Sequence, residues 1–198
     1  MLYEFLRERM LAFPNRTLSD ENKCFGFRAA LDYAERFAGT LRLHSHKYGI
    51  LCASEINSAL AILSCLAAGA VAVPLSYRYG KVHTGRIIGH TGLSHILTDE
   101  SGILEVRQIA EPSAEPEDLS DAALILCTSG TTGAPKGAVI TQENLITNLL
   151  DIERYFRIGE RDRILIARPL YHCAVLTGEF LISLCKGVDI SFYNGGFN

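Results

Sequence analysis

The sequence predicts an α/β fold: a doubly wound, largely parallel sheet with helices on both faces. Two observations carry this prediction. Helical patterns alternate with short strand-like segments along most of the 198 residues, as in proteins built from strand–helix–strand units. The strand-like segments are also continuous apolar runs, such as "YGILCAS" (48–54) and "AVAVPL" (70–75), which is typical of parallel strands buried on both faces.

The first half of the chain begins with an amphipathic helix that Pro14 ends. Charged residues interrupt its apolar run, so the segment does not have the pattern of a signal peptide. Its apolar face is formed by Leu2, Phe5, Leu6, Met10 and Leu11. Further helices are expected from Phe27 to about Leu43, over 55–66 and over 82–88, with strands at 48–54, 70–75 and 94–99.

The second half starts after an acidic, proline-containing connection at 111–118, and a subdomain boundary is expected near residues 111–120. Thr141 is expected to cap a helix over 142–156, with Glu143 in its first turn. Strands are expected in "AALILCTSG" (122–130, ending in a loop), at 137–141, at 162–170 and at 188–193, and a helix at 175–187.

Composition excludes several classes of partner. A net charge of -3 gives no basic surface for nucleic acid or an anionic membrane. Gly69 and Pro74 interrupt the longest nearly uncharged stretch, 56–77, so we expect a buried helix and strand there and no integral membrane segment. The six cysteines form no C-x-x-C pair and indicate buried free thiols in a reducing, cytoplasmic setting. They are Cys24, Cys52, Cys65, Cys127, Cys173 and Cys185.

The segment "TSGTTGAPKG" (128–137) is the strongest candidate for chemistry. Its glycines let a ligand approach the main chain closely, successive exposed N–H groups can hold an anion, and Lys136 adds a mobile positive charge suited to phosphate. Hydroxyl donors come from Thr128, Ser129, Thr131 and Thr132, and the glycines are Gly130, Gly133 and Gly137. Composition alone leaves an ordinary hairpin connection as an equal alternative.

An ordinary P-loop NTPase is a third interpretation of the same residues. That motif requires Ser or Thr after its lysine and opens a helix. Here Gly137 follows Lys136, and "AVIT" favours a strand. A phosphate site at a helix N-terminus is therefore disfavoured.

The ten residues "TSGTTGAPKG" resemble the phosphate-binding signature of the AMP-forming, adenylate-forming ligase superfamily, which includes acyl-CoA synthetases. Three further segments resemble that family in order and spacing: "FRAALDYAERFAGTL", "LAAGAVAVPLSYRY" and "PLYHCAVLTGEFLISLCKG". The resemblance covers nearly the whole chain. It implies that residues 1–198 are the N-terminal part of an AMP-binding ligase domain whose later parts are absent.

The resemblance implies an AMP-forming acid–thiol ligase that uses ATP and Mg²⁺. A small-molecule carboxylic acid would form an acyl-adenylate, and coenzyme A or an acyl-carrier protein would then take the acyl group. Thr128 would also lie near the magnesium ion, and no catalytic residue is assigned within these residues. The residues implied to bind the ATP phosphates are Thr128, Ser129, Gly130, Thr131, Thr132, Gly133 and Lys136.

His172 lies in "PLYH", which resembles the family motif that lines the acyl pocket and favours acyl- or aryl-CoA ligases. Val175 stands where the family often has glycine, so the pocket backbone is expected to differ there. The pair His44 and His46 is interpreted as part of a solvated turn. Cys127 ends an apolar strand and is expected to pack, without acting as a nucleophile.

We expect the 198 residues alone to be inactive as a ligase, with at most weak affinity for ATP or pyrophosphate. The alternative function is a stand-alone, non-catalytic module that binds a nucleotide or a partner and complements another chain. Self-association of the chain would not discriminate between the two, because an uncovered apolar sheet face promotes association in either case.

Overall fold

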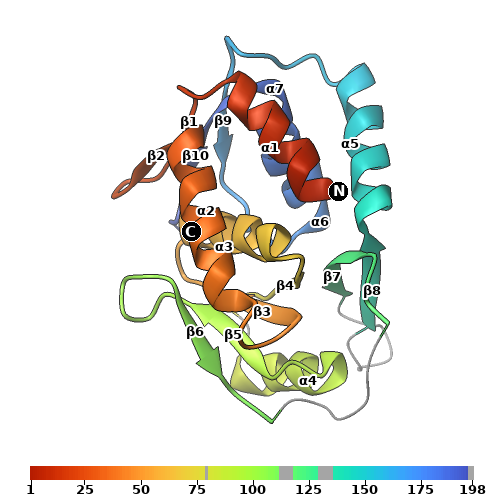
Figure 1. Cartoon of the computed structure of the whole chain (residues 1–198). Helices are drawn as coiled ribbons and strands as arrows, with labels where there is room; N and C mark the ends of the chain where they lie inside the picture. The colour runs from red at the N-terminus through yellow and green to blue at the C-terminus, as the bar shows by residue number, and fades with distance from the viewer. Residues whose placement is uncertain (79, 112–117, 129–135, 196–198) are drawn as a thin grey trace.

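The computed structural model describes residues 1–78, 80–111, 118–128 and 136–195, without the side chain of Thr128. These residues form two β-sheets with helices packed around them (Figure 1). The predicted α/β class, with largely parallel strands and helices on both faces, is confirmed. The strands are divided between the two sheets, because strands from the beginning and the end of the chain pair with one another.

The larger sheet has six strands, of which the four in the middle are parallel and the two at the edges antiparallel. The segment 111–120 joins β6 to β7 of this same sheet, and the subdomain boundary expected there stays a prediction. In spatial order the strands are β6 (Glu105–Gln108), β5 (His95–Thr98), β3 (Lys47–Leu51), β4 (Val71–Pro74), β7 (Ala122–Thr128) and β8 (Lys136–Thr141).

The smaller sheet has four strands. Its inner pairing joins β1 to β10 in parallel, with Leu18 opposite Ile190. In spatial order the strands are β2 (Cys24–Gly26), β1 (Thr17–Ser19), β10 (Asp189–Phe192) and β9 (Arg163–Ile166). Since β1 and β10 lie more than 170 positions apart in the sequence, this sheet holds the beginning and the end of the described chain together.

Helices cover both faces of the six-stranded sheet. Ala72 belongs to the larger core on the side of α3, whereas Val71 and Val73 belong to a smaller core with Ile87 of α4. Successive side chains of a strand point to opposite faces, so this alternation places α3 and α4 on opposite sides (Figure 1). The helices are α1 (Leu2–Ala12), α2 (Phe27–Leu41), α3 (Glu55–Ala68), α4 (Lys81–Thr91), α5 (Gln142–Tyr155), α6 (Cys173–Val175), η1 (Leu176–Leu181) and α7 (Ile182–Lys186).

Local signals explain where the main helices begin. Ser54 caps α3 by accepting a hydrogen bond from the Asn57 N–H at 3.4 Å. Thr141 caps α5 as predicted: its hydroxyl accepts from the Asn144 N–H at 3.1 Å, and the Asn144 side chain accepts from the Thr141 N–H at 3.3 Å. Such reciprocal bonds satisfy two N–H groups that the first helical turn leaves unpaired.

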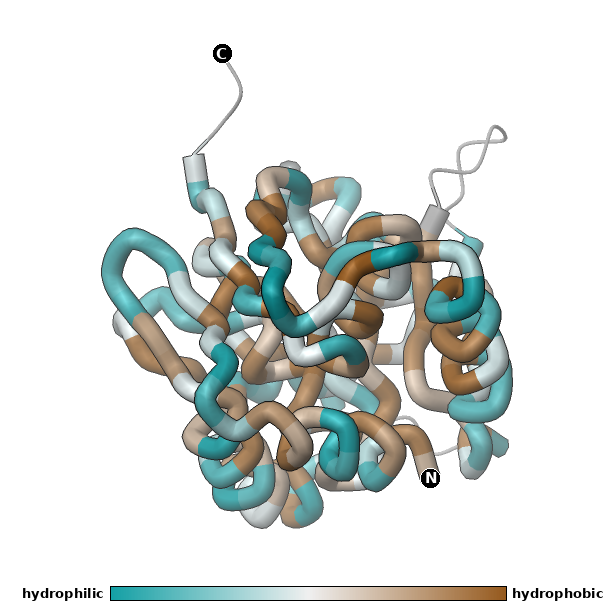
Figure 2. The backbone as a smooth tube through the Cα atoms, turned by 90° about the horizontal axis from the view of Figure 1, so that it is seen from above, coloured by the Kyte–Doolittle hydropathy of each residue, from teal (hydrophilic) through white to brown (hydrophobic). Residues whose placement is uncertain are grey.

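The nearly uncharged stretch 56–77 forms α3 and β4, which are buried along almost their whole length. Figure 2 shows the apolar segments gathered toward the middle of the molecule, with hydrophilic segments at the outer turns. None of the helices that the structure describes is both long and apolar enough to cross a membrane.

Several local features differ from the expectations. The strands β1, β2 and β6 were not predicted, and the expected helix at 175–187 contains the π-helical turn η1 between α6 and α7. Cys24 and Cys173 are exposed, so the prediction that the cysteines are buried is wrong for these two. Each is the first residue of an element only three residues long. All six thiols are free.

Candidate functional site

The ends of the candidate phosphate loop are held by an antiparallel hairpin. Thr128, the last residue of β7, pairs with Lys136, the first residue of β8. The Lys136 side chain is exposed. The residues between them, including Ser129, Gly130, Thr131, Thr132 and Gly133, lie outside the described residues, and their phosphate contacts stay a prediction.

The hairpin interpretation explains one glycine of the motif by packing. Gly137 lies opposite Cys127 in the β7–β8 pair, and a Cβ atom at Gly137 would lie 2.9 Å from Cγ2 of Ile125. That distance is too short for an ordinary contact, so any larger residue would require the Ile125 side chain to shift, and strand packing alone favours glycine here. Cys127 is half-buried, and burial raises the pKa of its thiol, which supports the packing role predicted for it.

The loop begins at the carboxyl edge of the parallel strands. β3, β4, β5 and β7 run in the same direction, so the residues that follow each of them meet at one edge of the sheet. Ligands of open α/β sheets bind at this edge. The residues that follow β3, β4 and β5 therefore lie at the same edge of the sheet as Thr128, the last residue of β7.

Asp99, directly after β5, organises the amino terminus of α3 at this edge. Its carboxylate accepts hydrogen bonds from the Ala53 N–H at 2.8 Å, the Ser54 N–H at 3.1 Å and the Asn57 side chain at 2.8 Å. A carboxylate that accepts main-chain N–H groups before a helix stabilises the helix start. Asp99 thus has a structural role that needs no bound ion.

A small cleft opens at the same edge, between α3, the end of β4 and the turn that precedes α6. Its wall is mostly apolar, with one carboxyl group, that of Glu55. The lining residues are Ile50, Cys52, Glu55, Ser58, Ile62, Pro74, Leu75, Tyr77, Leu170 and Tyr171. Two residues of the "PLYH" motif, Leu170 and Tyr171, are therefore part of this cleft.

Glu55 is the first residue of α3 and is only 6% exposed. Its carboxylate accepts a hydrogen bond from the Leu170 N–H at 2.9 Å, and its own N–H donates to the Asn194 side chain at 2.9 Å. Burial raises the pKa of Glu55 to about 7, an effect that Asp99 strengthens and that the Leu170 hydrogen bond and Arg78 oppose. Glu55 is therefore expected to change its protonation state near neutral pH.

His172 follows the cleft and precedes α6. It is exposed, its N–H donates to the Pro169 carbonyl at 3.2 Å, and its ring lies 4.2 Å from the Tyr171 ring, centre to centre. Desolvation and the nearby charge of Arg168 lower the pKa of His172, which favours the neutral imidazole. His172 is next to the cleft but not among its lining residues, so its predicted acyl-pocket role is not tested by this geometry. Val175 lies in the core, fully buried.

The chain matches the family model described as "AMP-binding enzyme" over residues 98–197. The chain belongs to this family. The matched region contains β7, β8, the loop between them and His172. Family membership thus supports the resemblance inferred from "TSGTTGAPKG" and from "PLYH".

Individual relatives of this AMP-binding chain agree with the family. A feruloyl-CoA synthase from Amycolatopsis is 32% identical over 150 residues, covering 67% of this chain and 30% of the relative. A 2-succinylbenzoate–CoA ligase from Bacillus licheniformis is 29% identical, covering 89% of this chain and 41% of the relative. The chain therefore spans well under half the length of these relatives.

The fold is also that of a solved member. O-succinylbenzoate coenzyme A synthetase (MenE) from Bacillus subtilis, solved in complex with AMP, superimposes with a TM-score of 0.80 at 25% identity. The match covers 98% of this chain and 56% of that one. The same enzyme was solved with the acyl-adenylate intermediate OSB-AMP, and matches with a TM-score of 0.79.

The remaining candidate metal-binding residues were the two histidines His44 and His46. His44 and His46 are both exposed, as predicted for a solvated turn, and the His44 ring lies 5.8 Å from that of His95. Within residues 1–78, 80–111, 118–128 and 136–195, no three His, Cys, Asp or Glu side chains gather where they could hold a metal ion.

Sequence reasoning missed Glu55. The available signal was a single carboxylate in the first turn of a helix that is apolar on almost every side. Such a position predicts burial, but not the partner of the carboxylate, because Leu170 is 115 residues away in the sequence.

Proposed function

We propose that this chain contributes the phosphate-binding loop and part of the acyl-site wall to an ATP-dependent, AMP-forming acid–thiol ligase. The observation that carries the proposal is the β7–β8 hairpin, which brings Thr128 and Lys136 together at the carboxyl edge of a parallel sheet within the region matched by the AMP-binding family. The donors available in 128–136 fit a polyphosphate: hydroxyl groups, glycine N–H groups and one ammonium group.

In the proposed reaction a carboxylate attacks the α-phosphorus of ATP, pyrophosphate leaves, and an acyl-adenylate forms. Negative charge on the β and γ phosphates must be held while pyrophosphate departs. Lys136 and the donors of the loop would hold it, because donors directed at developing negative charge stabilise it electrostatically. Mg²⁺, when bound, would neutralise part of the same charge, with Thr128 as the expected neighbour in this chain.

The acceptor and the acid are part of the same proposal. The names of the feruloyl-CoA synthase and of the succinylbenzoate–CoA ligase favour coenzyme A over a carrier protein as the acceptor. The neutral imidazole of His172, in tilted contact with the Tyr171 ring, would form part of the wall of the acyl pocket. We expect the acid to be a small-molecule carboxylic acid and the protein to be cytoplasmic.

Carboxylate-dependent exchange between ATP and pyrophosphate tests the proposal. The assay is run on two samples: the 198-residue chain, and the natural protein isolated with an antibody against this chain. The intact mass of the natural protein is measured as well. We expect exchange by a natural protein whose mass is well above 21.7 kDa. We expect its Lys136→Ala variant to lose this exchange, and the 198-residue chain to show no exchange.

Two other results would support different functions. ATP hydrolysis to ADP without any acid, abolished by Lys136→Ala, would indicate an ordinary P-loop NTPase. A natural protein of about 21.7 kDa that binds nucleotide but exchanges no pyrophosphate would indicate the stand-alone binding module.

A further inference from the structure

Glu55 joins three parts of the chain that are far apart in the sequence. Its side chain belongs to the first turn of α3, its carboxylate binds the Leu170 N–H of the turn 169–172, and its N–H binds Asn194 after β10. The first contact spans 115 residues and the second 139. One residue therefore connects the larger sheet, through α3, to both segments that follow strands of the smaller sheet.

The hydrogen bond between Glu55 and Leu170 is buried, and Leu170 is 1% exposed. A buried N–H that loses its acceptor carries the full desolvation cost, so this bond favours one local geometry of the turn. The two residues that follow Leu170 are Tyr171 and His172, whose rings are in contact.

Charged and titratable groups face Glu55 from several elements. Arg78, after β4, favours the ionised carboxylate, and Asp99, after β5, opposes it. Burial raises the pKa of the neighbouring Cys52 thiol, which stays protonated. Other such groups around the cleft and its hydrogen-bonded neighbours are Tyr77, Tyr171, Asp20, Glu21 and Lys23.

We propose that Glu55 is a positioning residue, whose ionised carboxylate holds the turn Pro169–His172 against the amino terminus of α3 and releases it partly on protonation. An ionised carboxylate accepts a hydrogen bond about twice as strongly as a neutral group. The turn is thus held more firmly when Glu55 is charged. The consequence for catalysis rests on the proposed function, in which His172 forms part of the acyl-site wall.

Nuclear magnetic resonance of the 198-residue chain tests this proposal without any substrate. The amide signal of Leu170 is followed from about pH 5.5 to 8.5, a range that brackets the ionisation of Glu55. In the wild type this signal should shift with a midpoint near neutral pH. In Glu55→Gln, which keeps an oxygen acceptor and cannot ionise, it should stay constant and match the protonated wild type.

A second variant removes the acceptor. Glu55→Ala should speed hydrogen exchange at the Leu170 amide by about tenfold or more and should shift the ring signals of Tyr171 and His172. Glu143 provides the matched controls, since it is an exposed glutamate in the first turn of α5. Glu143→Gln and Glu143→Ala should leave all of these signals as in the wild type.

The proposal is overturned if the Leu170 signal does not titrate in the wild type, or titrates equally in Glu55→Gln. It is also overturned if folded Glu55→Ala keeps the wild-type ring signals of Tyr171 and His172. If Glu55→Ala fails to fold, the comparison of the Leu170 titration in the wild type and in Glu55→Gln still tests the proposal. Since no nucleotide is present in this test, the expected result here combined with absent pyrophosphate exchange by the longer natural protein would reject the proposed function alone.

Discussion

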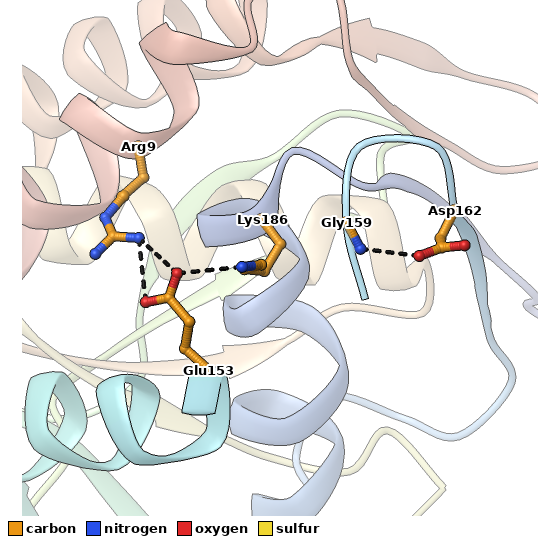
Figure 3. A network of polar contacts seen from close by, with 5 residues as sticks. All are labelled: Arg9, Glu153, Gly159, Asp162 and Lys186. Atoms are coloured by element: carbon orange, nitrogen blue, oxygen red, sulfur yellow. Dashed lines mark hydrogen bonds and ion pairs between the residues drawn. The ribbon is translucent and has the colours of Figure 1, made fainter. Parts of the chain in front are cut away.

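Arg9 of α1 and Glu153 of α5 are 144 residues apart in the sequence, yet Nη1 of Arg9 donates to both carboxylate oxygens of Glu153, at 3.1 and 3.2 Å (Figure 3). Lys186 of α7 donates to the same carboxylate at 3.3 Å. The three side chains are between 26% and 33% exposed. Glu153 of α5 therefore connects α5 to α1 and to α7 through these contacts.

We predict that Glu153→Gln lowers the free energy of unfolding at neutral pH by about 1–2 kcal/mol, because two charge-assisted contacts are lost in a partly buried setting. Burial raises the pKa of Glu153, but the hydrogen bonds and charges of Arg9 and Lys186 outweigh it and lower the pKa. The contribution is therefore present above the unfolded-state pKa and lost as the pH falls through the folded-state value. Urea unfolding at neutral and acidic pH measures it.

The control for this prediction is Glu160→Gln, at an exposed position after α5. It should change stability by less than about 0.5 kcal/mol. Equal stability of Glu153→Gln and the wild type at neutral pH would show that the three-helix contact contributes nothing.

Gly187→Ala should be strongly destabilising. Gly187 ends α7 with φ of +62°, and an added Cβ would lie 2.3 Å from the Phe13 ring. The left-handed backbone alone costs about 1 kcal/mol for alanine, and the collision adds more. Gly69→Ala separates the two effects, because Gly69 has φ of +72° with open space around its Cβ position.

Thermal or urea unfolding of both variants decides this point. We expect a loss of about 1 kcal/mol for Gly69→Ala and at least twice that for Gly187→Ala. Equal losses at the two positions would show that the Phe13 contact carries no cost.

Ser183→Ala should leave stability unchanged or raise it by up to about 1 kcal/mol. The Ser183 hydroxyl is fully buried and has no hydrogen-bond partner among the described residues. Ser64 is the matched comparison, since it is also fully buried in a helix but donates to the Leu60 carbonyl at 2.7 Å. Ser64→Ala should be the less stable of the two variants in urea unfolding, and the opposite order would contradict the account.

Glu55 should make the wild type less stable as the pH rises. Its pKa is raised to about 7 by burial, so its favourable contribution is complete below the unfolded-state pKa and is lost as the pH passes the folded-state value. By linkage the loss relative to Glu55→Gln amounts to about 3 kcal/mol between acidic and mildly alkaline pH. Unfolding curves of the two proteins across that range check it. Parallel pH dependence of both would contradict the raised pKa.

Much of the fold could be predicted because its strands are apolar runs. β3, β4 and β7 are buried on both faces, so their sequences are distinct from the helices around them. β2 and β6 are short, and none of their residues is fully buried, so their sequences contain no such apolar run. The division into two sheets also escaped prediction, since the pairing of β1 with β10 depends on contacts across nearly the whole chain.

The candidate site was predicted to a similar extent. The motif predicted the loop, and the structure confirms the strands that end at Thr128 and begin at Lys136. The phosphate contacts of Thr128, Lys136 and the residues between them stay a prediction. The Glu55–Leu170 contact could not be predicted, because no sequence pattern around either residue indicates the other as its hydrogen-bond partner.

Direct binding of MgATP and pyrophosphate to the 198-residue chain tests the central claim, the phosphate role of the loop. Equilibrium dialysis compares the wild type with Lys136→Ala and with Arg36→Ala, which removes one charge from an exposed position on α2. We predict weak, saturable binding by the wild type and by Arg36→Ala, and binding about tenfold weaker in Lys136→Ala. Equal saturable binding by the wild type and Lys136→Ala would contradict the account.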